Sequence, residues 1–153
     1  LVEAHVKNQR IAGAQLVVGG SHWPVTAKSF GVRSVSDQEP VNDDTLFCIG
    51  SCSKMISAAV ILKLVEEGKL ELDVPINRWL KEFAKPQIEK TGAAKRAPTL
   101  RELLCHRSGV YSQRDSMSKS QTRWIRDFEL TLQESASGIA RETLATEPGT
   151  RFA

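Results

Sequence analysis

The chain has 153 residues, 41% of them hydrophobic, and a formal net charge of +3, which is the composition of an ordinary globular domain. The charge is small and the basic residues are spread along the chain, so nucleic acid is not expected as a partner. No apolar run reaches the roughly 18 residues that a membrane helix needs, so no membrane span is expected either. The longest run, 56–65, is interrupted by Ser57 and Lys63 and is typical of a buried helix.

The first third of the chain predicts an antiparallel hairpin. Residues 11–18 are apolar and partly β-branched, and Gly19-Gly20 follows them as a predicted turn. Residues 25–32 alternate loosely and contain Gly31 where a strand is expected to bend. The polar segment 36–44 is then expected to be a loop, and the short apolar stretch 45–49 leads to Gly50.

The middle of the chain changes to a helical pattern. Residues 51–67 predict a helix that ends at Gly68. Its expected inward face consists of Met55, Ala58, Ala59, Leu62 and Val65. A short helix over 76–83 is expected to bury Trp79 and Leu80, and the basic segment 85–97 is expected to be an exposed loop.

Two capping boxes predict helix starts farther on. Thr99 with Glu102 is expected to open a helix through Cys105, and Thr131 with Glu134 a helix through about Arg141. The second helix is expected to turn Leu132, Ala136, Ile139 and Ala140 inward. Between the two, 112–122 is predicted to be a mobile polar segment, and Trp124, Ile125 and Phe128 to share a helical face. A turn is expected at 147–149. Strands followed by helices indicate an α+β fold.

The three cysteines, Cys48, Cys52 and Cys105, are an odd number, which argues against a full disulfide framework. No histidine lies near Cys48 and Cys52 to complete a zinc site, so neither a metal nor a cofactor is expected. All three are predicted to be small buried hydrophobic side chains. No signal peptide is recognised. The compartment is therefore left open between the periplasm or secretion and the cytoplasm.

The candidate catalytic motif is Ser51-Cys52-Ser53-Lys54, at the point where the chain passes from Gly50 into a predicted helix. Residues three apart share a helical face, so Lys54 is expected to reach the Ser51 hydroxyl. A helix N-terminus favours negative charge on the attacking oxygen and later on an oxyanion. Desolvation disfavours a charged lysine, so a neutral Lys54 is expected to act as general base toward Ser51.

The four-residue pattern has two competing interpretations. A second match begins at Ser116 and ends at Lys119, but no apolar helix is expected after it to exclude water. At Ser51 the structural alternative is a serine N-cap followed by an ordinary helical lysine. Local physics alone leaves the catalytic and structural interpretations of Ser51 evenly balanced.

Three further segments, which follow one another along the chain, help to choose between the catalytic and the structural interpretation. They are 45–54 with its continuation 65–75 (VEEGKLELDVP), 99–110 (TLRELLCHRSGV) and 147–152 (EPGTRF). The first resembles the active-site helix of class C beta-lactamases, related esterases and D-alanyl-D-alanine carboxypeptidases. The second is similar to the leucine-leucine-x-His-x-Ser-Gly segment of that superfamily, and the third to the run before its Tyr-x-Asn motif. Ile11 to Ala14 also fits its first core strand.

The resemblance implies a beta-lactamase and transpeptidase fold, with a helical region and an antiparallel sheet flanked by helices. It implies a serine hydrolase in which a lactam, peptide or ester carbonyl acylates Ser51 while Lys54 and the tyrosine of Tyr-x-Asn move the protons. The Ser51 backbone N–H is implied as one oxyanion donor. The expected substrate is a small ester, amide or beta-lactam. A carboxypeptidase, or a non-catalytic binding protein that keeps the fold, remains as an alternative.

The chain departs from the superfamily pattern at its end. Beyond Ala153 the resemblance places Tyr-x-Asn, and later a strand with Lys-Thr-Gly or His-x-Gly. Lys90-Thr91-Gly92 has the right letters but lies in the basic segment after the nucleophile helix, so it is not expected to be that strand. Residues 1–153 are therefore expected to be the N-terminal portion of one catalytic domain, which a companion chain completes.

His106 is the histidine that a Ser-His-Asp triad would require. The chain has no Gly-x-Ser-x-Gly elbow, and His106 closes a short helix before Gly109. A structural histidine that caps backbone carbonyls is the expected role.

Overall fold

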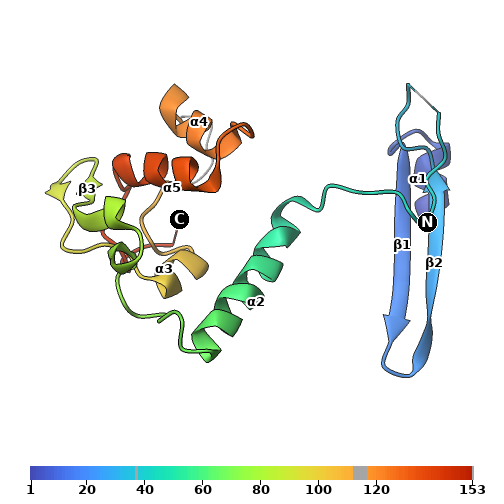
Figure 1. Cartoon of the computed structure of the whole chain (residues 1–153). Helices are drawn as coiled ribbons and strands as arrows, with labels where there is room; N and C mark the ends of the chain where they lie inside the picture. The colour runs from blue at the N-terminus through green and yellow to red at the C-terminus, as the bar shows by residue number, and fades with distance from the viewer. Residues whose placement is uncertain (37, 112–116, 153) are drawn as a thin grey trace. The chain divides into compact units, whose positions relative to one another are not determined.

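A computed structural model describes residues 1–36, 38–111 and 117–152, without the side chains of residues 23 and 24. The chain forms two compact units, Leu1–Ser51 and Cys52–Ala153. The first contains α1 (Val2–Lys7) and the strands β1 (Gly13–Gly20) and β2 (Trp23–Gly31). The second contains the remaining helices and a very short hairpin (Figure 1).

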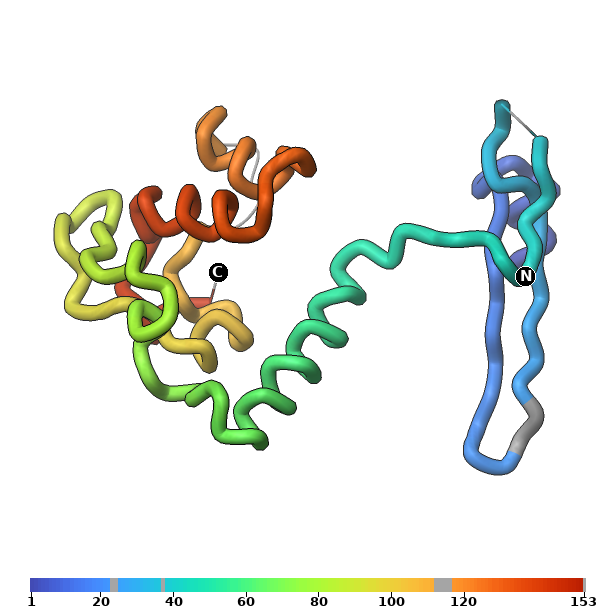
Figure 2. The backbone as a smooth tube through the Cα atoms, in the orientation of Figure 1, coloured from blue at the N-terminus to red at the C-terminus, as the bar shows by residue number. Residues whose placement is uncertain are grey.

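The predicted hairpin is confirmed. β1 pairs antiparallel with β2, with Gly13 opposite Gly31 and Val17 opposite Ala27, and Figure 2 follows the backbone through both strands. The turn lies at Ser21-His22 and not at Gly19-Gly20, since both glycines belong to β1. The apolar alternation that predicted the strand does not fix where the chain reverses.

The hairpin is packed at one end only. There α1 contacts both strands, and Val41 is the buried residue among those that the structure describes in this unit. Gly31 has φ +70°, and a Cβ at this position would come within 2.2 Å of the Ala12 carbonyl oxygen, so a side chain has no room there. Farther along β1, Val17 and Val18 are exposed. Consecutive strand residues point to opposite faces, so both faces of the hairpin carry uncovered apolar side chains here.

The second unit begins with α2 (Ser53–Glu66), which follows the 3-10 turn η1 (Gly50–Cys52). The predicted stop is confirmed, because Gly68 has φ +69° and its N–H donates to the Val65 carbonyl. No residue of α2 is buried. The predicted inward face is wrong for this chain, and Met55 is 70% exposed.

The core of the second unit lies elsewhere. Its buried residues are Ile76, Phe83, Ala97 and Ala140, and partly buried aliphatic residues pack around them: Leu80, Leu100, Leu103, Val110 and Ile139. Two 3-10 turns, η2 (Ile76–Arg78) and η3 (Lys81–Ala84), replace the predicted helix over 76–83. The buried side chains are those of Ile76 and Phe83, whereas Trp79 is exposed.

The basic segment 85–97 is less exposed than predicted. It forms the hairpin of β3 (Gln87–Ile88) and β4 (Gly92–Ala93), and Ile88 and Ala97 are buried. The Leu144 N–H donates to the Gln87 carbonyl at 2.6 Å, which ties this hairpin to the residues after α5 (Leu132–Arg141). The segment is thus a packed part of the unit.

Both predicted capping boxes are confirmed. Thr99 caps α3 (Leu100–Leu104) and Thr131 caps α5. A third capping box, formed by Ser118 and Gln121, opens α4 (Lys119–Arg126), where a mobile segment was predicted. The match beginning at Ser116 thus ends in a helix, but this helix is polar (KSQTRWIR) and is not the apolar helix whose absence was expected. Ser116 itself lies outside the described residues, as does the rest of 112–116.

Several side chains that helical periodicity placed inward are exposed. Ala140 is buried and Ile139 half-buried as expected, but Leu132 is 91% and Phe128 95% exposed. Phe128 lies beyond the end of α4, so it does not share the face of Trp124. All three cysteines are free and exposed, so the prediction of buried cysteines is wrong. No helix in the described part of the chain is long and apolar enough to cross a bilayer.

Candidate active site

Ser51 and Lys54 lie on one continuous helical path. Gly50 has φ +51°, a left-handed conformation that turns the extended chain into η1. Ser51 follows in η1, Cys52 has right-handed helical angles of −60° and −25°, and Lys54 lies in the first turn of α2. Residues at positions i and i+3 of such a path share a face. Both side chains are exposed in this chain.

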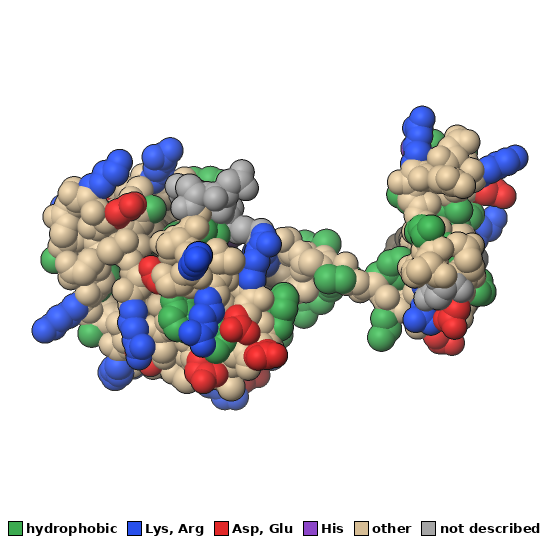
Figure 3. All heavy atoms as spheres, turned by 90° about the horizontal axis from the view of Figure 1, so that it is seen from above, with side chains coloured by type: hydrophobic (Ala, Val, Ile, Leu, Met, Phe, Trp, Pro, Cys, Tyr) green, Lys and Arg blue, Asp and Glu red, His purple; other side chains and the backbone are tan. Residues whose placement is uncertain are grey.

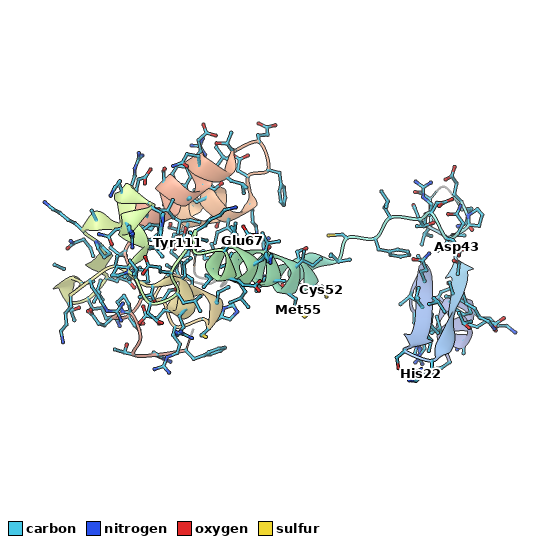
Figure 4. All side chains as sticks on the ribbon, turned by 60° about the horizontal axis from the view of Figure 1, so that its bottom comes forward. His22, Asp43, Cys52, Met55, Glu67 and Tyr111 are labelled. Carbon is cyan, nitrogen blue, oxygen red and sulfur yellow. The ribbon has the colours of Figure 1, made fainter. Side chains whose placement is uncertain are left out.

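The surface around the motif is apolar. Ile49 lies before Ser51, and Met55 and Ile56 follow Lys54. All three are exposed. Figure 4 shows Cys52 and Met55 at the start of α2 with their side chains extending away from the helix. A helix that is apolar on all sides is normally buried in a folded globular protein. The described residues therefore leave the apolar start of α2 uncovered.

Two of the three segments that carry the resemblance lie side by side in the second unit. The Ala145 N–H donates to the Gly109 carbonyl at 2.7 Å, and the Gly149 N–H to the Arg107 carbonyl at 2.8 Å. Gly109 has φ +77°, and a Cβ on it would lie 2.1 Å from the Thr146 carbonyl oxygen. The His-x-Ser-Gly segment thus packs backbone to backbone against the run that ends in EPGTRF.

His106 has a different role from the one predicted. It has φ +54° and follows the C-cap residue Cys105 of α3. Its backbone N–H donates to the Leu103 carbonyl at 3.2 Å. Its exposed ring lies against Phe152, with 5.8 Å between the ring centroids. The ring of His106 therefore contacts Phe152, and the predicted capping of backbone carbonyls by this side chain is not observed.

Tyr111 is a feature that the sequence did not single out. It is the one tyrosine of the chain and directly follows the 99–110 segment. Its hydroxyl is buried and has no hydrogen-bond partner among the described residues. Burial, and secondarily the Glu142 carboxylate, raises the pKa of Tyr111 to about 12. A phenol with this pKa stays protonated at neutral pH, so Tyr111 is a poor candidate for a proton acceptor.

The described residues form no metal site, and charges of both signs are mixed on one face of the molecule. Lys and Arg side chains are interspersed with Asp and Glu on the face shown in Figure 3. No three His, Cys, Asp or Glu side chains of the described residues are grouped so that they could hold a metal ion.

Comparison with known proteins identifies the class. The family model described as Beta-lactamase matches residues 1–153. Esterase EstB from Burkholderia gladioli is 30% identical over 152 residues, which are 94% of this chain and 38% of the esterase. The mitochondrial serine beta-lactamase-like protein LACTB of Bos taurus is 33% identical over 117 residues, 75% of this chain and 20% of that protein.

Solved structures agree with the sequence comparisons. EstCE1, described as a hydrolase with promiscuous acyltransferase activity, has a TM-score of 0.79 at 27% identity, over 99% of this chain and 41% of its own. The D-amino acid amidase of Ochrobactrum anthropi SV3 has a TM-score of 0.72 at 28% identity, over 99% and 38% respectively.

The chain belongs to the beta-lactamase family, within the superfamily of serine beta-lactamases and penicillin-binding proteins. Its fold is α+β of the beta-lactamase type. It spans about two fifths of the length of EstB and EstCE1, so it contains part of that fold. The proteins that it is similar to include an esterase and a D-amino acid amidase.

Proposed function

We propose that this protein is a serine hydrolase in which Ser51 is the nucleophile and Lys54 the general base. The observation that carries the proposal is the placement of the two residues, three apart on one helical path that starts at the left-handed Gly50. The similarity to an esterase and to an amidase of the same fold supports hydrolysis of an acyl bond.

The reaction follows from the two groups. Ser51 Oγ attacks the carbonyl carbon of the substrate, and its proton passes to a neutral Lys54 Nζ. The tetrahedral oxyanion is held by donors that include the Ser51 backbone N–H, aided by the positive end of α2. The leaving group takes the proton as the carbonyl re-forms, which gives an acyl-enzyme. A water molecule then releases the acid and restores Ser51.

A small ester is the preferred substrate, with an amide of a D-amino acid or a D-alanyl-D-alanine peptide second and a beta-lactam third. The order follows the relatives: an esterase matches nearly the whole chain, a D-amino acid amidase is a close structural neighbour, and a putative penicillin-binding protein, PbpX of Bacillus subtilis, matches 71% of the chain. The non-catalytic alternative predicts binding of the same compounds without turnover.

The site also requires a covering partner. The exposed apolar side chains of α2 and of β1 need further polypeptide of the same domain, whether it continues this chain or is a companion chain. That polypeptide is proposed to bury α2, to desolvate Lys54 and to bring the tyrosine of Tyr-x-Asn. The relatives, which are more than twice as long as this chain, support this requirement.

The test is covalent labelling of the full-length protein with a fluorophosphonate, followed by peptide mapping. Label is expected on Ser51 and is expected to disappear in Ser51→Ala. Ser53→Ala is the matched control, since Ser53 lies two residues away at the start of α2, and it is expected to label normally. Label on Ser116, or no label on any serine, contradicts the proposal.

A further inference from the structure

The turn that precedes the expected tyrosine is closed by its own hydrogen bonds. The Thr150 N–H and hydroxyl both donate to the Glu147 carbonyl, at 3.2 and 2.7 Å. Gly149 has φ +86°, a conformation that favours glycine. The chain leaves this turn through Arg151 and Phe152, so the geometry of 147–150 sets the direction in which the polypeptide continues.

The carboxylate of Glu102, in α3, lies against one side of this turn. A Cβ built on Gly149 would come within 2.6 Å of Glu102 Oε1 and 3.3 Å of Arg96 Nη2. The carboxylate is itself fixed, because Oε2 accepts from the Thr99 N–H at 2.9 Å and from Arg96 Nη1 at 2.8 Å. A second guanidinium nitrogen, Arg96 Nη2, donates to Oε1. The turn therefore rests on a rigid planar ion pair.

Two more residues hold the turn. On its backbone, the Gly149 N–H donates to the Arg107 carbonyl at 2.8 Å, and the guanidinium of Arg107 donates back to the Gly149 carbonyl. The Lys95 N–H donates to Glu147 Oε1 at 2.9 Å. Gly149 is thus bound by Arg107 through both of its backbone polar groups.

The ion pair stays charged under ordinary conditions. The hydrogen bonds from Arg96 hold the pKa of Glu102 below its usual value, and Glu102 raises the pKa of Arg96. The Glu102 side chain is 14% exposed, so solvent screens this pair less than the surface pairs of the chain.

We infer that Arg96, Glu102 and Arg107 form a clamp that positions the catalytic tyrosine expected shortly after Phe152. The inference rests on the proposed function, because only the resemblance places Tyr-x-Asn there. The ring of His106 against Phe152 extends the same support one step farther along the chain. Arg107 acts through the backbone of Gly149, and the Glu102 carboxylate lies beside Gly149 where a side chain would be; both are positioning residues.

The experiment uses the full-length protein and p-nitrophenyl acetate. Glu102→Gln keeps the capping box, for which glutamine is as suitable as glutamate, but removes the charge that holds Arg96. Arg107→Gln removes the donor to the Gly149 carbonyl. Each is expected to lower kcat by about 10- to 100-fold with little change in KM, as misplacement of a catalytic group does. Arg107→Lys keeps one donor and is expected to recover most of the loss.

The matched control is Asp73→Asn. It removes the charge of the two-bond pair of Asp73 with Arg101, which neighbours Glu102 in α3, and neither residue takes part in the hydrogen bonds given above for the 147–150 turn. Its kcat is expected to match that of the wild type. Hydrogen exchange at the Gly149 and Thr150 amides is expected to quicken in Glu102→Gln and Arg107→Gln, but not in Asp73→Asn.

Wild-type kcat in both clamp variants overturns the positioning role and leaves the proposed function standing. An equal fall of kcat in Asp73→Asn also overturns the positioning role, since any disturbance of α3 would then lower kcat. A wild-type protein that is neither labelled at Ser51 nor active overturns the proposed function and the positioning role together. Unchanged amide exchange overturns the clamp itself, whatever the activity.

Discussion

Helices α2 and α5 both contain apolar residues at helical spacing, but only those of α5 are packed into a core. α5 is capped by Thr131, buries Ala140 and contacts η3 and α4. α2 is the longer helix, has no side-chain cap and buries nothing. The difference teaches that α2, which carries Lys54 of the proposed pair, buries none of its residues within the described chain, whereas α5 helps to form a core. The α5 side of the unit already has a core of its own.

The largest expected effect is on the activity that we propose for Ser51 and Lys54. Lys54→Met in the full-length protein is expected to lower kcat by roughly 10²- to 10⁴-fold, the usual contribution of a general base. Steady-state hydrolysis of p-nitrophenyl acetate measures it. Lys63→Met, which removes the exposed partner of Glu66 in the same helix, is the control and is expected to retain activity. Equal losses in both variants would mean that Lys54 acts only through helix stability.

The core on the α5 side predicts the largest change in stability. Ile76 is 2% exposed and lies at the centre of the cluster. Ile76→Ala is expected to lower the free energy of unfolding by about 2–5 kcal/mol, because the transfer energy is lost and a cavity remains. Denaturant unfolding of the full-length protein measures it. A loss below about 1 kcal/mol contradicts this assignment of the core.

α2 offers a test that depends on chain length. Val60→Ala in the 153-residue chain is expected to change the unfolding free energy by less than about 0.5 kcal/mol, since Val60 is exposed there. In the full-length protein the same change is expected to cost about 1–2 kcal/mol, because burial of each methylene contributes about 0.8 kcal/mol. Equal effects in the two chains contradict the proposal that further polypeptide covers α2.

The helix starts predict a smaller difference. Thr131→Ala is expected to cost about 1 kcal/mol, because the Glu134 N–H loses the side-chain oxygen of its cap. Cys52→Ser is expected to change stability by less than about 0.5 kcal/mol, since Cys52 has helical angles and not the extended ones of a capping residue. Thermal unfolding of the two variants compares them, and a larger effect at Cys52 reverses the ranking.

The smallest expected effect is a pH dependence. Because Arg96 lowers the folded-state pKa of Glu102 below its usual value of 4.5, the stability it contributes is present above pH 4.5 and is lost as pH falls through the folded-state pKa. Glu102→Gln lacks this contribution at every pH. The difference in Tm between wild type and variant is therefore expected to shrink below about pH 4.5. A constant difference from pH 7 to pH 3 contradicts the assignment.

Local sequence rules predicted the elements that depend only on neighbouring residues. The capping boxes at Thr99 and Thr131 and the stop at Gly68 follow from contacts a few residues apart, and the pairing of the first two strands follows from neighbouring segments of the chain. All are confirmed. The same rules failed for burial. Periodicity shows which face of a helix is apolar, but not whether the chain contains anything to cover it, as Met55 and Leu132 demonstrate.

The sequence by itself determined the first hairpin, the starts of α3 and α5, the family and the spacing of Ser51 and Lys54, because these depend on residue types and short separations. Only the tertiary structure revealed the Glu102 and Arg107 clamp on Gly149, the burial of Ile76 and Phe83, and the raised pKa of Tyr111. Those features join residues far apart in the chain, such as Arg107 and Gly149. The physical reason is that desolvation and hydrogen-bond geometry are properties of packed neighbours.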